Sequence, residues 1–464
     1  MADSSKVRVR EPRREGQKVE FEIRDDSLPV EHPARLIWEV LGLLDLGVFT
    51  QGAKAVEGGR GGALKSRRLL LALWCYGLTQ RIVSAREIAR RVLPTSQDLA
   101  FRWLAGDMCV SHTLLSEFLV EHVDAMQALF TNVLRMLQSK GLIFLPDHRV
   151  AQDGTRVRAD AAMASFRKRD ALEQAREQAE LQLKAVLARL DAPRARAAQE
   201  READDDDDDY GGEQDPEPGP RLPEGEDHGD PPLTEAQQLA RERGAMDVLD
   251  RIHKASRVLQ ELQEQRSNSS SKKRQTTEPK ASTTDPEARI MKVSNGGFEP
   301  SFNVQLAVVG SPMGGPATIV GVQVTNVGTD KNSILPMREQ VERRTGHALN
   351  EILVDADHLT HEEVRAAREH ERPLIVIAPV PKHWASSEAP QDPGIAAWMD
   401  EAKTEPMRRA YRARKSLVER ANATLKERFG MRRVPVRGVP KVLCFFLLGS
   451  VVADLMQHGL SLLT

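Results

Sequence analysis

The spacing of apolar residues changes along this chain, and that change limits the folds it can adopt. Between residues 31 and 145, apolar side chains recur at helical spacing, as in 112-HTLLSEFLVEHVDAMQALFTNVLRML-137. From residue 298 the spacing becomes that of strands, in FNVQLAVVG (302–310) and TIVGVQVTN (318–326). The sequence therefore predicts an all-α N-terminal part followed by an α/β part.

A long charged segment interrupts the α/β part after its first strand. Amphipathic helices are predicted at 166–190 and 234–265, and between them residues 200–230 carry fifteen acidic residues against two arginines, a net charge of −13. We interpret this tract as a solvating linker, and mimicry of DNA is the sharper alternative. The order strand, insertion, strand, strand, helix, strand, helix, strand, loop, helix predicts a mixed sheet with helices packed on it. The last helix of this order is predicted from about 395 to 430.

The net charge of −2 conceals a strongly basic segment. Residues 401–437 hold twelve Lys or Arg against four Glu, so a near-neutral isoelectric point does not exclude nucleic acid as the partner. The three cysteines lack CxxC spacing, which suits a reducing cytosol and argues against a thiolate metal site. The N-terminus is polar, and the apolar stretch 442–453 is predicted to be too short to span a bilayer. We expect a cytoplasmic protein with no membrane partner.

Two strands are predicted to end in aspartate, Asp153 in 149-RVAQDGTRVRAD-160 and Asp355 in 351-EILVDADH-358. Side chains at adjacent strand ends converge, and two converging carboxylates require a cation. Hard oxygen ligands without a Cys or His cluster indicate Mg²⁺ or Mn²⁺. Glu419, an isolated acid in a basic helix, is the candidate third ligand, and Lys426 shares its helix face.

Other interpretations remain open for these residues. Asp153 followed by Gly154 is also typical of a hairpin turn. Asp357 competes with Asp355, and Glu419 also fits a solvated charge on an exposed helix. Gln305 and Gln323 are interpreted as edge or sheet-surface groups. The three histidines considered as zinc ligands lack a fixed ligand spacing, namely His358, His361 and His383. The GGRGG run at 58–62 lacks the residues of a phosphate loop, so no nucleotide cofactor is expected.

Four motifs in order resemble bacterial insertion-sequence transposases of the DDE class. They are RVAQDGTRVRAD (149–160), DPEARIMKVSNGGFEPSFNVQLAVV (285–309), ILVDADHLTHEEV (352–364) and the Tyr411–Arg414–Glu419–Lys426 series. The branch resembled has a DGT first motif, a long helical insertion and a Y-R-E-K signature. The resemblance covers about residues 30–460. The second motif departs from it, because Asp-x-Gly-Tyr is usual where this chain has Asp355-Ala356-Asp357-His358.

The resemblance implies an RNase H-like catalytic domain with Asp153, Asp355 and Glu419 as the catalytic and metal-binding triad. It implies two divalent ions about 3.5–4 Å apart that support an in-line displacement. Signature positions Tyr411, Arg414 and Lys426 are expected to contact the DNA backbone. The full expected DNA-binding set is Arg156, Arg158, Tyr411, Arg414, Lys426, Arg432 and Arg433.

The expected domains follow from these patterns. They are a flexible arm (1–30), a helical DNA-binding domain (31–145), a catalytic domain (146–165 and 285–440), a helical insertion (166–284) with an acidic disordered tract (197–232), and a C-terminal apolar helix (441–464). Ser84 and Glu87 form a capping box that predicts a helix start. Residues 84–104 fit either a helix-turn-helix or part of an ordinary helical bundle.

The leading functional prediction is a transposase that cuts at terminal inverted repeats and joins 3′-hydroxyls to target DNA. It is expected to form a homo-oligomer on DNA, in the bacterial cytoplasm and at the nucleoid. Two alternatives stay open: an inactive, transposase-derived DNA-binding protein acting as a repressor or scaffold, and a structure-selective nuclease on the same fold.

Overall fold

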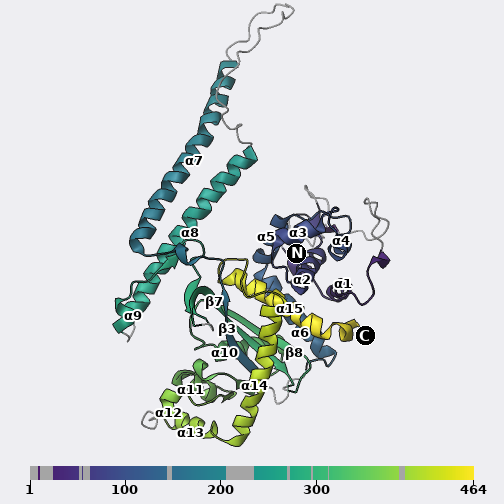
Figure 1. Cartoon of the computed structure of the whole chain (residues 1–464), viewed down its shortest axis with the longest axis vertical. Coiled ribbons are helices and arrows are strands. Elements are labelled where there is room, and N and C mark those ends of the chain that lie inside the picture. Colours follow the sequence, from purple (N-terminus) through teal and green to yellow (C-terminus); the bar gives the residue numbers. More distant parts are fainter. Residues whose placement is uncertain are drawn as a thin grey trace, which may run out of the picture. The chain divides into compact units, whose positions relative to one another are not determined.

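The structure, a computed structural model, divides into two compact units. It describes residues 9–10, 25–51, 55, 63–143, 149–204, 235–268, 272–293, 296–311, 313–385 and 392–463. Unit 1 comprises Met1–Ala161 with Glu287–Thr464, and unit 2 comprises Ala162–Pro286 (Figure 1). The predicted insertion, 166–284, falls within unit 2. The predicted flexible arm lies outside the described residues except for 9–10 and 25–30, and the acidic tract except for 197–204.

A mixed sheet forms the centre of unit 1. Its strands are β3 (Arg149–Arg158), β6 (Arg289–Lys292), β7 (Phe298–Gly310), β8 (Ala317–Thr325), β9 (Glu351–Leu353) and β10 (Ile375–Ile377). The order is β10-β9-β3-β7-β6, and β8 also pairs with β7. β9 runs parallel to β3 and β10, whereas β7 runs antiparallel to β3, β6 and β8. This mixed α/β arrangement is compatible with an RNase H-like DDE domain.

The strand β7 has almost no exposed residues, because both its faces and both its edges are covered. Residues 300–309 are all buried, although the run includes the polar side chains Ser301, Asn303 and Gln305. Buried polar groups must find hydrogen-bond partners. The expectation that Gln305 lies at a sheet surface was therefore wrong, and its partners belong to the candidate site described below.

Helices that pack on the sheet come mainly from the second half of the chain. They are α10 (Ile334–Thr345), α11 (His361–Glu369), α12 (Lys382–Ala385), α13 (Pro393–Glu401) and α14 (Glu405–Ala423), with a π-helical turn at Thr424–Arg428. One long helix was predicted over 395–430. The structure instead breaks it after α13, and a proline in the first turn of α14 begins the new helix.

The N-terminal helices belong to the same unit as the sheet. They are α1 (Pro33–Gly42), α2 (Arg67–Thr79), α3 (Ala85–Val92), α4 (Leu99–Ala105), α5 (His112–Glu121) and α6 (Val123–Ser139), and β1 (Val9–Arg10) pairs with β2 (Leu64–Lys65). Ser84 caps α3 as the capping box predicts, since its hydroxyl accepts from the Glu87 amide at 3.4 Å. Every residue of α4 from 100 to 105 is buried, so α4 has no free face for a DNA groove. The bundle interpretation of 84–104 therefore fits the structure, and a helix-turn-helix reader does not.

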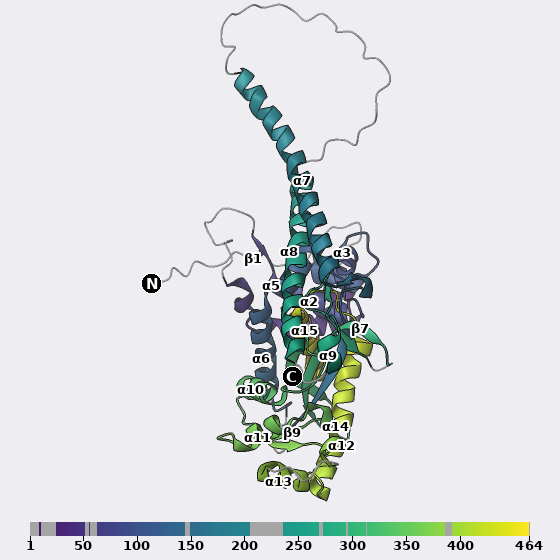
Figure 2. The same cartoon turned by 90° about the vertical axis from the view of Figure 1, so that its left-hand side faces the viewer.

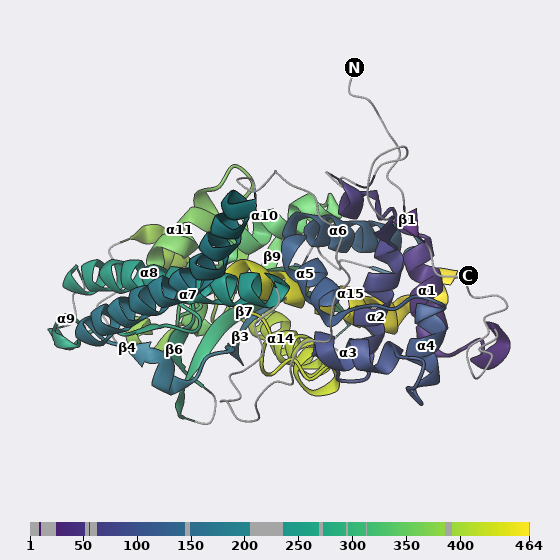
Figure 3. The same cartoon turned by 90° about the horizontal axis from the view of Figure 1, so that it is seen from above.

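The C-terminal helix α15 (Val439–Leu463) covers the outer edge of β8. The Asp454 carboxylate accepts from the Ile319 amide at 2.9 Å, Gln457 accepts from the Ala317 amide at 2.7 Å, and His458 contacts the Thr318 hydroxyl. α15 also packs against α1, α2, α5 and α6 (Figure 3). Backbone groups of an edge strand need partners when they are buried, and α15 supplies them.

The apolar part of this helix is longer than the stretch 442–453 suggested. Its segment Val439–Gly459 is long and apolar enough to cross a membrane, contrary to the expectation from residues 442–453. However, 72% of its most apolar window is buried inside the structure, as in a core helix of a folded domain. Its polar contacts with β8 agree with that role.

Unit 2 is an antiparallel helical hairpin. The helices α7 (Arg169–Asp204) and α8 (Glu235–Ser267) lie side by side (Figure 2). The remaining elements are the short helix α9 (Lys272–Thr276) and the paired strands β4 (Phe166–Arg167) and β5 (Ala281–Ser282). A small apolar cluster closes the base of the hairpin, formed by Leu172, Ala255, Leu259 and Ala281.

Candidate active site

Asp153 lies within a continuous strand and not in a hairpin turn. Residues 151–158 of β3 pair with β7, so the Asp153–Gly154 dipeptide continues the ladder. The parallel partner β9 pairs only with residues 149–151. The prediction that Asp153 ends its strand was wrong for the strand itself, although Asp153 does lie just beyond the end of the parallel pairing.

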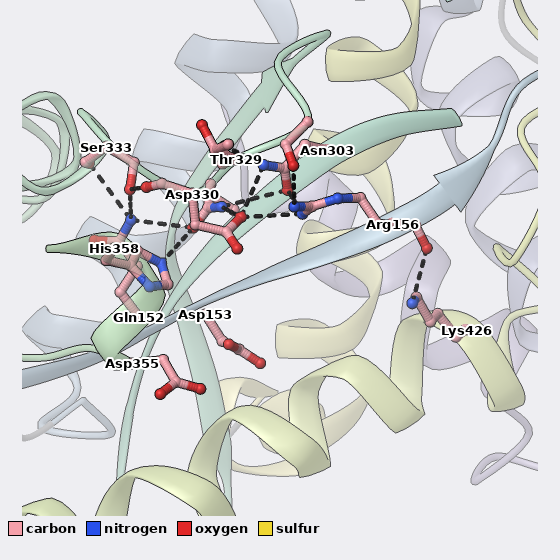
Figure 4. Close-up of polar contacts among 12 residues, drawn as sticks. Gln152, Asp153, Arg156, Asn303, Thr329, Asp330, Ser333, Asp355, His358 and Lys426 are labelled. Atoms are coloured by element: carbon pink, nitrogen blue, oxygen red, sulfur yellow. Dashed lines mark hydrogen bonds and ion pairs between the residues drawn. The ribbon is translucent and has the colours of Figure 1, made fainter. Parts of the chain in front are cut away.

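Register brings Asp153 and Asp355 to equivalent positions. Ala151 pairs with Leu353 on the parallel strand, and each aspartate follows its paired residue by two positions. Asp355 begins the short 3-10 turn at Ala356–His358, where its carboxylate accepts from the Ala356 amide at 2.8 Å. The two carboxylates lie side by side in Figure 4.

The guanidinium of Arg414 lies against both carboxylates. Its Nη2 is 2.5 Å from Asp153 Oδ1 and 3.8 Å from Asp355 Oδ2, and its Nε donates to the Gln152 carbonyl at 3.2 Å. The Arg414 side chain is only 8% exposed, whereas those of Asp153 and Asp355 are 27% and 49% exposed. One buried cation thus offsets part of the negative charge of the pair, with its shorter contact to Asp153.

Burial raises the pKa of the Asp153 carboxyl above its ordinary value. The Arg414 charge opposes that rise, and the charges of Asp330 and Asp355 add to it. Burial likewise lowers the pKa of the Lys426 ammonium, and the nearby Asp153 charge partly offsets the effect. The site is therefore a set of charges that act on one another at close range.

Glu419 does not join this cluster in the structure. It lies on the outward stripe of α14 with residues 412, 415 and 423, and its carboxylate is 3.8 Å from Lys415. Arg414 occupies the inward stripe. Within the described ranges, no group of three or more His, Cys, Asp or Glu side chains is arranged to hold a metal ion. Asp357, the rival of Asp355, is exposed on the 3-10 turn.

Several of the basic residues expected to bind DNA gather at the far end of β3. Arg156, Arg158, Lys426, Arg432 and Arg433 line a cavity of about 350 Å³ together with Val293 and Glu299. The segment 432–434 continues alongside β3, since the Arg158 amide donates to the Arg432 carbonyl and the Val434 amide donates to the Arg158 carbonyl. Arginine and lysine are the side chains that contact backbone phosphates, so the lining of this cavity suits a phosphate group.

Tyr411 borders a second cavity, whose lining does not include the two aspartates. The cavity measures about 550 Å³ and combines aliphatic and cationic side chains, including Met407, Arg408 and Arg412. The Arg414 guanidinium lies 5.9 Å from the Tyr411 ring centroid. Tyr411 therefore connects this cavity to the carboxylates through Arg414.

A buried polar network behind the aspartate pair was not recognised from the sequence. One oxygen of Asp330 accepts from Arg156 at 3.0 Å, Asn303 at 2.8 Å and Gln305 at 2.6 Å (Figure 4). Arg156, expected to bind DNA, thus directs its guanidinium into this network. The available sequence signal was two amide side chains at alternate positions of an otherwise apolar strand, Asn303 and Gln305.

Gly154 is required by this network and not by a turn. A Cβ added at Gly154 would lie 2.2 Å from the Asp330 carboxylate and 2.3 Å from the Gln305 amide nitrogen. Contacts that short cannot be accommodated without displacing both side chains. Because Gly154 has no side chain, the Asp330 carboxylate can lie directly against β3.

Comparison with known proteins gives one partial match. Residues 392–457 match the family model for the transposase DDE domain, a segment that contains α13, α14 and most of α15. Arg414, Glu419 and Lys426 lie within the matched segment, whereas Asp153 and Asp355 lie outside it. No curated protein and no solved structure matches the chain significantly. The family match supports a DDE transposase, with a function related to transposition and DNA as its substrate.

Proposed function

We propose that this protein is a divalent-metal-dependent transposase that cuts DNA at transposon ends and transfers the 3′-hydroxyls to target DNA. The observation that carries the proposal is the register of Asp153 and Asp355, which sets two carboxylates side by side at the end of the parallel pairing. The partial family match supports the same reaction class. We further propose that the protein acts in the bacterial cytoplasm. There it would bind DNA as a homo-oligomer that holds two transposon ends together.

The donor set of the aspartate pair fits a hard divalent cation. Asp153 and Asp355 offer carboxylate oxygens, the ligands that Mg²⁺ and Mn²⁺ prefer, and a positive group already lies against them. In this class of chemistry, divalent ions neutralise charge that develops on the attacking and leaving oxygens of a phosphodiester. Glu419 would complete the ligand set only after a rearrangement of α14 or its side chain, because its present position is outward.

The protein's own cations would hold the DNA. The cavity at the end of β3 offers Lys426, Arg158 and Arg433 to backbone phosphates, and the Tyr411 cavity offers Arg408 and Arg412. Such contacts fix the register of DNA without reading its sequence. Base reading would fall to the N-terminal helices, and the buried α4 is excluded from it.

A second candidate is a DNA-binding protein that has lost its chemistry. The outward position of Glu419 and the Arg414 guanidinium between the aspartates favour it, because both leave the triad incomplete. The two candidates predict the same DNA binding and differ in cleavage.

The test uses the full chain and DNA that contains the sequences flanking its own gene. With Mg²⁺ or Mn²⁺, we expect end cleavage and strand transfer by the unchanged protein. Asp153→Asn, Asp355→Asn and Glu419→Gln should reduce both to background, and Asp357→Asn should not. Mn²⁺ binding, measured by electron paramagnetic resonance, should weaken in the first two variants. DNA binding without cleavage under either metal would favour the second candidate, and cleavage that survives Asp153→Asn would contradict the first.

A further inference from the structure

In the buried network behind Asp153 and Asp355, the Asp330 carboxylate determines which side-chain groups donate and which accept. An ionised carboxylate only accepts, so the Asn303 and Gln305 side chains must turn their NH₂ groups towards Asp330. Burial opposes ionisation of Asp330, but the hydrogen bonds and charges of Arg156 and Asn303 outweigh it and hold the pKa of this carboxyl below its ordinary value. Asp330 is thus the fixed acceptor of the network.

The orientation of the Gln305 side chain then determines which groups its amide oxygen accepts hydrogen bonds from. With its NH₂ group on Asp330, its oxygen Oε1 faces Gln152 Nε2 at 3.2 Å and His358 Nε2 at 3.0 Å. An amide oxygen only accepts, so both of these nitrogen atoms must donate to it. His358 therefore carries its hydrogen on Nε2. Gln152 uses its remaining donor on the Ser333 hydroxyl at 2.9 Å.

Gln152 and His358 are the two residues that connect this network to the candidate acids. Gln152 precedes Asp153 directly in β3, and its carbonyl accepts from the same arginine that contacts both acids. His358 closes the 3-10 turn that Asp355 begins, and its backbone amide donates to the Asp355 carbonyl at 3.1 Å. One amide side chain, Gln305, therefore fixes the neighbours of both acids at once.

We propose that Asp330 is a positioning residue for the candidate active site, because it orients Gln305 so that one amide oxygen holds both Gln152 and His358 and thereby aligns Asp153 with Asp355. This inference rests on the proposed function for its catalytic consequence, whereas the orientation of the network stands independently. Gly154 is part of the same arrangement, because only a residue without a side chain lets the Asp330 carboxylate and the Gln305 amide approach β3 so closely.

The first test reads the network without any reaction. Nitrogen-15 NMR of histidine-labelled full-length protein, with the His358 signal assigned by its loss in His358→Gln, reports which ring nitrogen carries hydrogen. We expect hydrogen on Nε2 in the unchanged protein, and a mixture of tautomers in Asp330→Asn, where the side chain can also donate. Asp400→Asn, an exposed acid of α13, is the matched control and should leave the signal unchanged. A His358 with hydrogen only on Nδ1 in the unchanged protein would overturn the proposal even if the variant fails to fold.

The second test measures chemistry and DNA binding separately. Asp330→Asn should lower the cleavage rate at saturating DNA about 10- to 100-fold, the usual effect of removing a group that orients a ligand, while DNA affinity stays within about two-fold. The double variant Asp330→Asn with Gln305→Glu moves the acceptor by one residue and should recover part of both the rate and the Nε2 signal. Unchanged cleavage in Asp330→Asn, or loss of rate and DNA affinity together, would contradict a positioning role. If the unchanged protein does not cleave at all, the proposed function fails and the NMR result still decides the network.

Discussion

Unit 1 contains two aspartates beside the same sheet, Asp330 with a side chain 17% exposed and Asp454 fully buried, and their hydrogen-bond partners differ. Asp330 receives three donors on one oxygen, one of them the guanidinium of Arg156. Asp454 in α15 receives one backbone amide, that of Ile319, and its other oxygen has no hydrogen-bond partner among the described residues.

The two carboxyl groups consequently have opposite pKa shifts. Asp330 has its pKa lowered, because its partners outweigh the burial that opposes ionisation. Burial raises the pKa of Asp454 well above its ordinary value, and the single amide opposes it too weakly. The comparison teaches that a buried acid remains a charged acceptor only where cationic and amide donors surround it. Asp330 can direct a network for that reason, whereas Asp454 caps an edge strand.

The largest effect is expected from removing the charged member of the comparison. Asp330→Ala leaves the guanidinium of Arg156, whose side chain is 18% exposed, without its counter-ion, and it removes one acceptor from each of the Asn303 and Gln305 amides. Breaking a fully buried pair costs about 3–5 kcal/mol of the free energy of unfolding, which is the upper limit for this partly exposed pair. Chemical denaturation at pH 7.5 measures the loss. A loss equal to that of Asp454→Ala would show that the two sites are energetically alike and would break the comparison.

The next effect concerns the approach of Asp330 to β3. Gly154→Ala should destabilise the fold by about 1–3 kcal/mol, the usual cost of overpacking, since its Cβ would overlap Asp330 and Gln305. Gly328→Ala is the matched control, because the nearest atom to its added Cβ is 3.9 Å away. Thermal unfolding of the two variants checks this prediction, and equal melting temperatures would contradict the close approach.

The stability contributed by Asp454 should change with pH in the opposite direction. The folded pKa of Asp454 lies above the unfolded one, so the folded protein retains a proton that the unfolded chain releases. The stability contributed by this group is therefore lost as pH rises between the two values. Asp454→Asn keeps the acceptor for Ile319 and cannot ionise, so it should raise the free energy of unfolding at pH 8.

The pH dependence of that gain sharpens the comparison. The stabilising effect of Asp454→Asn should shrink as pH falls towards the ordinary aspartate range. Asp330 has the reverse sign, since its lowered pKa gives stability that is present above the unfolded pKa and is lost as pH falls through the folded one. Urea titrations of Asp454→Asn and Asp330→Asn between pH 2.5 and 8 measure these slopes, and slopes of the same sign would contradict the assignment.

The smallest effect is expected at Glu419. Its pair with Lys415 is exposed, and such pairs contribute between about 0 and 1 kcal/mol. Glu419→Gln should therefore leave the melting temperature nearly unchanged. A large destabilisation would mean that Glu419 has structural partners beyond Lys415. A stable variant without cleavage activity would instead indicate that Glu419 acts only in the DNA-bound state.

Much of the fold could be predicted because it depends on local spacing. The change from helical to strand period located the sheet after residue 298, and the capping box at Ser84 located the start of α3. Asp153 and Asp355 could be identified as candidate site residues because each follows a short apolar run in the sequence. The lengths of the strands were harder to predict from the sequence. Asp153 was predicted to end its strand, because no local pattern indicates that β3 continues to pair with β7 as far as Arg158.

The sequence by itself determined which elements form and which side chains carry charge, because hydrophobic period and residue chemistry are local properties. The tertiary structure decided which charges meet. Register across β3 and β9 joined Asp153 to Asp355, and the direction of α14 turned Arg414 inward and Glu419 outward. Asp330 meets Gly154 over a separation of 176 residues, and such a contact follows only from how strands pair and pack, which no local pattern specifies.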